Sequence, residues 1–182
     1  GAPVLGVFAG ALAGIFASLI FGFLTLSLLS NQVATGLALT IFGTGLSALF
    51  GLEYVGKTIE QIEPIYIPLL TDLPFIGRIL FGHDPLIYLA IGILGLTAWF
   101  LRRTRAGMVL RAVGDSDYSA HAIGYPVIAI RYAAVAFGGA MAGLGGAYLS
   151  LAYTTLWAEN MSAGRGWIAL ALVVFASWRP NR

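Results

Sequence analysis

The feature that most constrains the fold is an apolar run from about Val4 to Leu29 that contains no charged side chain. A helix that crosses a membrane needs about 20 apolar residues at a rise of about 1.5 Å each. Three further runs of roughly that length follow, over about Val33–Leu52, Pro85–Leu101 and Val127–Leu151. We therefore expect an all-α fold, a polytopic bundle of transmembrane helices.

Composition also points to the bilayer as the solvent. The chain has 182 residues, of which 59% are hydrophobic and only 10% charged, whereas soluble domains carry about a quarter charged residues. The formal net charge of +2 is small, and we expect no nucleic-acid partner. Cysteine is absent, and His83 and His121 match no metal-ligand spacing, so we predict no disulfide and no metal site.

The ends of the chain suggest part of a longer membrane protein. It starts at Gly1, no basic segment precedes the first apolar run, and it stops just after a fifth run, about Trp167–Trp178. That fifth run is too short to span alone, so it is either half of a broken helix or a truncated span. We expect residues 1–182 to form a single, partial transmembrane domain.

Two runs carry glycines at a spacing of four. Gly6, Gly10 and Gly14 recur in the first, and Gly139 and Gly143 in the fourth. Small residues at this spacing let helix backbones approach closely in lipid. We therefore expect both runs to use these faces for close helix packing.

Loop charges predict the orientation, because Lys and Arg concentrate on the cytoplasmic side of membrane proteins. A net acidic loop over about 53–84, with a possible surface helix over Val55–Ile62, is expected outside. A polar segment over about 102–126 is expected in the cytoplasm. The basic residues that support this side are Arg102, Arg103, Arg105, Arg111 and Arg131.

Within the polar segment, we predict a short helix of about eight residues. Asp115 is a suitable N-cap for a helix that begins at Ser116, Gly124 suits the left-handed position after its end, and Pro126 prevents continuation. Such a helix could lie in a groove of a partner protein. The alternative is an ordinary surface helix in a cytoplasmic loop.

One match to a known motif, the phosphate loop, is misleading. Residues 51–58, GLEYVGKT, match the phosphate-loop pattern G-x-x-x-x-G-K-[ST] literally. A true phosphate loop follows a strand and has slim residues, whereas this segment follows an apolar run and contains Glu53, which would repel phosphate. We predict no nucleotide binding here. No grouping of acids, serines and histidines suggests catalysis, so we do not expect an enzyme.

Several segments in order resemble the inner-membrane permease subunits of bacterial ABC importers for simple sugars, nucleosides and branched-chain amino acids. These are TRAGMVLRAVG at 104–114 and AHAIG at 120–124, followed by a glycine-rich span. The segments NQVATGL at 31–37 and MSAGRGWIALALVVFASWRP at 161–180 resemble the nucleoside and simple-sugar branch in particular. The resemblance implies ATP-driven uptake and a location in the bacterial inner (plasma) membrane.

The resemblance also implies partners and roles. The short helix would be the coupling helix that contacts a separate ATPase subunit, which binds ATP and Mg²⁺, so this chain needs no cofactor of its own. A second permease subunit, identical or homologous, and an extracytoplasmic substrate-binding lipoprotein would complete the assembly. The coupling residues would be Asp115, Ser116, Asp117, Tyr118, Ser119, Ala120, His121, Ala122, Ile123 and Gly124.

Candidate pathway residues are polar groups at membrane depth, which are costly in lipid and usually face a cavity. Aromatic and charged groups near the outer surface could line the entrance. Hydrogen bonds between helices and interfacial anchoring are the alternative roles. The candidates are Asn31, Gln32, Thr35 and Thr44 in the membrane, and Trp157, Glu159, Arg165 and Trp167 at the mouth.

Two other functions remain open on the sequence alone. An ion-gradient-driven secondary transporter or channel would need acids or bases at membrane depth, and the predicted spans carry none there. A membrane-embedded scaffold without transport is the third possibility. Nothing in the sequence identifies the substrate.

Overall fold

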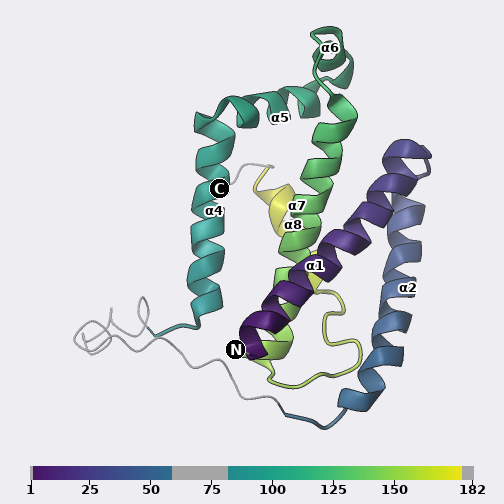
Figure 1. Ribbon diagram of the computed structural model, residues 1–182, viewed down its shortest axis with the longest axis vertical. Helices are drawn as coiled ribbons and strands as arrows, with labels where there is room; N and C mark the ends of the chain where they lie inside the picture. The colour runs from purple at the N-terminus through teal and green to yellow at the C-terminus, as the bar shows by residue number, and fades with distance from the viewer. Residues whose placement is uncertain (1, 59–81, 178–182) are drawn as a thin grey trace.

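The computed structural model describes residues 2–58 and 82–177, and every regular element in these ranges is helical (Figure 1). Two of the long helices end in a short π-helical segment, and α2 ends in a 3₁₀ turn. The elements are α1 (Ala2–Gly22), η1 (Phe23–Ser27), α2 (Gln32–Gly51), η2 (Leu52–Tyr54), α4 (Pro85–Arg103), α5 (Arg105–Asp115), α6 (Asp117–Ala122), α7 (Val127–Tyr148), η3 (Leu149–Tyr153) and α8 (Arg165–Phe175).

Four helical stretches are long and apolar enough to cross a membrane, at the positions of the four predicted runs. They extend over Pro3–Ser27, Gln32–Tyr54, Pro85–Arg103 and Val127–Tyr153. The predicted all-α helical bundle is therefore confirmed. The fifth run forms α8, which has 11 residues and is too short to span.

The most extensive packing in the described chain is between α1 and α7, which cross each other (Figure 1). A Cβ atom added to Gly14 would fall on the carbonyl oxygen of Gly139 and 2.9 Å from the Cα of Gly143. A Cβ on Gly10 would lie 3.1 Å from the carbonyl oxygen of Gly143. The two glycine faces predicted from the sequence therefore pack against each other.

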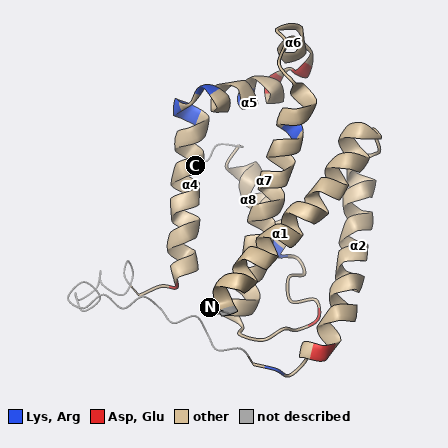
Figure 2. Cartoon of the chain, in the orientation of Figure 1, with Lys and Arg blue, Asp and Glu red and all other residues tan. Residues whose placement is uncertain are grey.

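Charged residues gather at the two ends of the bundle, and most of the described arginines lie at the end where α5 runs (Figure 2). Arg102 and Arg103 end α4, and Arg105 and Arg111 lie on α5, which runs across that end of the molecule. The acidic η2 turn at the end of α2 lies at the opposite end. By the rule that Lys and Arg concentrate on the cytoplasmic side, we expect the α5 end to face the cytoplasm.

The polar segment is more ordered than the sequence interpretation predicted, because its first half is the separate helix α5 rather than a loop. A sharp corner joins α4 to α5. The Thr104 hydroxyl donates to the Phe100 carbonyl at 2.7 Å and accepts from the Gly107 N–H at 3.0 Å. This side chain therefore closes the end of α4 and caps the start of α5.

The predicted surface helix over Val55–Ile62 is wrong in its described part. Val55 forms an isolated bridge with Trp157, and Thr58 forms one with Leu156. The segment after η2 therefore turns at Gly56 and pairs with the loop at Leu156 and Trp157, and it does not continue as a helix. Residues 59–62 lie outside the described residues, as does most of the predicted outer loop.

Candidate functional site

The first candidate site is α6, which projects beyond the rest of the bundle at the basic end (Figure 1). The predicted helix exists, but it is shorter, and its N-cap is not Asp115. Asp115 is the last residue of α5, and the Ser116 hydroxyl accepts from the Ser119 N–H at 3.3 Å. The extended backbone of Ser116 separates the two helices, which is the conformation an N-cap requires.

The end of α6 follows the prediction. Gly124 has a φ of +93°, its N–H donates to the His121 carbonyl at 2.9 Å, and the Tyr125 N–H donates to the Ala120 carbonyl at 3.2 Å. This pair of bonds is a Schellman motif, which needs a left-handed residue where glycine has no steric cost. The chain then turns directly into α7.

A small apolar core holds α6 against its neighbours. Val113 of α5, Ala120 of α6 and Val127 of α7 are buried together, and Ala120 is only 3% exposed. Ala120 therefore belongs to the interior of this corner, although the sequence interpretation placed it among the partner contacts. The side chains on the outer surface include Tyr118, 84% exposed, and Ile123, 76% exposed.

An ion pair adds a second link between α6 and α7. An Arg131 guanidinium nitrogen lies 3.2 Å from an Asp117 carboxylate oxygen. The side chains are 41% and 58% exposed, and such surface pairs contribute only about 0–1 kcal/mol to stability. The pair therefore orients α6 more than it stabilises the fold.

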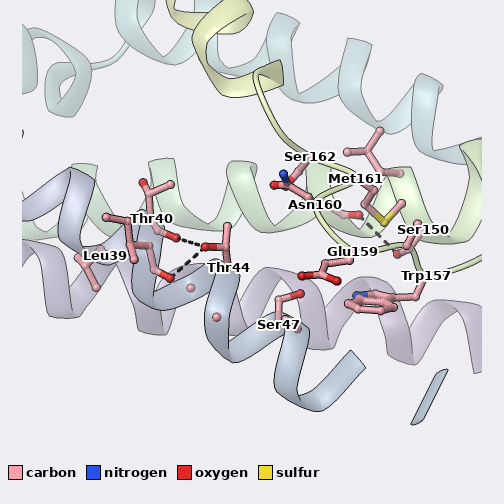
Figure 3. A pocket seen from close by; sticks show the side chains of 17 residues that line it. Leu39, Thr40, Thr44, Ser47, Ser150, Trp157, Glu159, Asn160, Met161 and Ser162 are labelled. Atoms are coloured by element: carbon pink, nitrogen blue, oxygen red, sulfur yellow. Dashed lines mark hydrogen bonds between the residues drawn. The ribbon is translucent and has the colours of Figure 1, made fainter. Parts of the chain in front are cut away.

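The second candidate site is a pocket of about 730 Å³ between α2, the α7–η3 segment and the loop around residues 157–162 (Figure 3). Hydroxyl, amide, carboxylate and indole groups line it together with small residues. Its polar and aromatic side chains are Thr40, Thr44, Ser47, Ser150, Trp157, Glu159, Asn160 and Ser162.

Trp157 fixes the loop that forms one wall of the pocket. Its indole lies directly on Gly51 at the end of α2, where a Cβ atom would overlap the ring. The Thr154 hydroxyl donates to the Leu149 carbonyl at 2.6 Å and anchors the start of the loop to η3. The wall therefore depends on glycine at position 51.

The pocket gathers three of the predicted pathway residues, Thr44, Trp157 and Glu159. Two others have structural roles. The Asn31 side-chain oxygen caps α2 by accepting from the Val33 and Ala34 N–H groups at 3.0 and 3.1 Å, and the Arg165 guanidinium lies 5.1 Å from the Tyr153 ring centre.

The remaining three candidates lie apart from the pocket lining. Thr35 is buried in α2, Gln32 is exposed at the start of that helix, and Trp167 on α8 is 69% exposed. Sequence reasoning missed Thr40, Ser47, Ser150, Asn160 and Ser162. Thr40, Thr44 and Ser47 are three and four residues apart, a helical spacing that could have indicated a common face.

The phosphate-loop match has no phosphate-loop structure. Residues 51–54 are the end of α2 and the η2 turn, so no strand precedes the motif. Trp157 also covers Gly51. Among the described residues, no group of three His, Cys, Asp or Glu side chains lies close enough to hold a metal ion.

Four helices of spanning length, a basic end and a projecting short helix define a multi-pass helical membrane protein. Comparison with known families then identifies it further. The chain belongs to the family described as the branched-chain amino acid transport system / permease component, whose model matches residues 1–181.

Three curated proteins are similar to this chain, each over 98% of its length. A putative glucose ABC transporter permease protein of Haloferax volcanii is 42% identical, and the match covers 55% of its own length. A nucleoside ABC transporter permease protein of Lactococcus lactis subsp. cremoris is 34% identical, and a guanosine ABC transporter permease protein of Bacillus subtilis is 31% identical, each matched over 58% of its length. The chain thus spans little more than half of these relatives. No solved structure matches it significantly.

Proposed function

We propose that this chain is part of a permease subunit of an ATP-driven ABC importer for nucleosides or simple sugars in the plasma membrane of its host cell. The names of the three relatives support this class of function and these two kinds of substrate. The observation that carries the proposal is α6, a small capped helix presented beyond the basic end of the bundle.

In this proposal, α6 and the adjoining residues 115–124 form the contact with a separate ATPase subunit. The ATPase binds ATP and Mg²⁺ and performs hydrolysis, while this chain contributes no catalytic group. A second permease subunit and an extracytoplasmic substrate-binding lipoprotein complete the assembly. Tyr118, Ala122 and Ile123 are the exposed apolar groups of α6 and its end that would face the ATPase.

The packing offers a route for motion from the ATPase into the membrane. A displacement of α6 would act on α7 through the shared core of Val113, Ala120 and Val127 and through the Arg131–Asp117 pair. Helix α7 would carry α1 with it, because their glycine faces leave no room to slide independently. Helix α4 is joined to this unit through α5.

The proposal is tested by replacing exposed residues of the projection. Ala122→Asp and Ile123→Asp each add a charge to the surface without entering the small core. We expect ATP-driven uptake in reconstituted vesicles, and co-purification of the ATPase, to fall at least about tenfold, the effect of losing about 1.4 kcal/mol of contact energy. Ala122→Ser is the matched control and should retain both properties.

Full uptake by Ala122→Asp and Ile123→Asp would contradict the coupling role of α6. Uptake by the wild-type assembly that follows an imposed ion gradient in the absence of ATP would favour a secondary transporter instead. Equal expression of the variants in the membrane fraction establishes that any loss is not a failure of insertion.

A further inference from the structure

The pocket between α2 and η3 has a definite hydrogen-bonding character. The Thr40 hydroxyl donates to the Gly36 carbonyl at 2.8 Å, and the Thr44 hydroxyl donates to the carbonyls of Thr40 and Ile41 at 3.0 and 2.9 Å. The hydrogens of these hydroxyls are therefore occupied by their own helix. The two hydroxyl oxygens can therefore only accept hydrogen bonds from a ligand, through their lone pairs.

The opposite wall shows the same arrangement. The Ser150 hydroxyl donates to the Ala147 carbonyl at 3.2 Å, so it too presents an acceptor. Ser47, Asn160 and Ser162 can both donate and accept. Acceptors thus line both helical walls of the pocket, with a few groups of mixed character near the loop (Figure 3).

The charge of the lining also favours a ligand that donates hydrogen bonds and carries no negative charge. Glu159 is the only charged side chain among the described residues that line the pocket, and it is exposed. An ionised carboxylate only accepts hydrogen bonds and repels anions. The nearest basic residue along the loop, Arg165, lies over the Tyr153 ring and is not part of the lining.

We infer that Glu159 sets the charge selectivity of this pocket: it excludes anionic compounds and leaves the site to a neutral ligand that presents several hydrogen-bond donors, such as a hydroxylated ring. The inference rests on the proposed function and assigns to Glu159 the discrimination against phosphorylated and carboxylated relatives of its substrates. The indole of Trp157, held on Gly51, supplies an apolar surface for a ring. The described residues of the lining include no cation for a phosphate or carboxylate.

The absence of cysteine from the sequence allows a direct test. Ser47→Cys, made in the full-length permease after any cysteine outside residues 1–182 is replaced by serine, places the one thiol of this subunit in the pocket of the assembled transporter. The probes are two methanethiosulfonates of similar size, one with a trimethylammonium group and one with a sulfonate. We expect the cationic reagent to react at least about fivefold faster than the anionic one, after correction for their reactivity with a free thiol.

Glu159→Gln should remove this preference, because it keeps the shape of the side chain while deleting its charge. Glu159→Lys should reverse it. His83→Cys, which lies just before α4 and does not line the pocket, is the control: its ratio should not respond to either substitution. An unchanged ratio at Ser47→Cys in Glu159→Gln would overturn the role of Glu159.

The ligand class is tested by asking which compounds protect the cysteine of Ser47→Cys from labelling. Glucose or guanosine at millimolar concentration should slow labelling by a neutral maleimide, whereas glucose 6-phosphate and guanosine monophosphate should not. Equal protection by the phosphorylated and unphosphorylated compounds, or no protection by either glucose or guanosine, would refute the inference. Labelling requires neither ATP nor uptake, so this result is separate from a failure of the importer proposal.

Discussion

At the scale of single residues, adjacent glycines have different roles. Gly138 and Gly139 are neighbours on α7, yet a Cβ on Gly138 would meet nothing within 4 Å. A Cβ on Gly139 would overlap the Ser18 side chain and the Gly14 carbonyl oxygen of α1. Of these two neighbours, only Gly139 is required for the close approach of the two helices.

This difference gives a matched pair of variants. Gly139→Ala should lower the free energy of unfolding by about 1–3 kcal/mol, because overpacking forces the helices apart. Gly138→Ala should be neutral or slightly stabilising, since alanine is the better helix former. Thermal unfolding of the two variants in detergent measures the effect. Equal melting temperatures would show that α1 and α7 are not packed as described.

At the scale of elements, the corner between α4 and α5 determines where α5 and α6 lie. A Cβ on Gly107 would overlap the Phe100 carbonyl oxygen and approach the Leu101 Cα at 2.7 Å. The corner therefore admits only glycine at this position of α5. Gly114, near the other end of the same helix, has nothing within 4 Å of such an atom.

Gly107→Ala should open the corner and change the separation of α4 from α7, whereas Gly114→Ala should not. Spin labels on cysteines introduced at Leu94 of α4 and Phe137 of α7, both exposed, report this separation by pulsed electron paramagnetic resonance. We expect a shifted or broadened distance distribution for Gly107→Ala only. A distribution identical to that of the unsubstituted protein would mean that the corner is not under steric control.

The corner also shows a limit of the sequence interpretation. The polar segment after α4 was correctly separated from the spans, but α5 was not recognised as a helix. Its apolar residues Val109, Leu110 and Val113 are buried or half-buried and lie at helical spacing, a signal that the sequence interpretation did not use. Similarly, Asp115 and Ser116 are both good N-caps, and nothing local decides between them. The structure selects Ser116, because α5 continues through Asp115.

At the scale of the whole molecule, the concentration of arginines at the α5 end predicts the orientation in the membrane. Single cysteines at Ser119 of α6 and at Ser162 of the pocket loop test it in a chain that has none of its own. A membrane-impermeant maleimide added to intact cells should label Ser162→Cys, whereas Ser119→Cys should react only after the membrane is permeabilised. Labelling of Ser119→Cys in intact cells would reverse the orientation.

The sequence by itself determined the number and boundaries of the long helices, because a spanning length and a lack of charge are local properties. It also located the basic end, the short helix before Gly124 and the glycine faces. Only the tertiary structure decided that Gly14 packs on Gly139, that Ala120 is internal, and that Thr44, Trp157 and Glu159 share one pocket while Asn31 caps a helix. These are contacts between residues distant in sequence or choices among equivalent local partners, and they depend on how the helices cross rather than on any single segment.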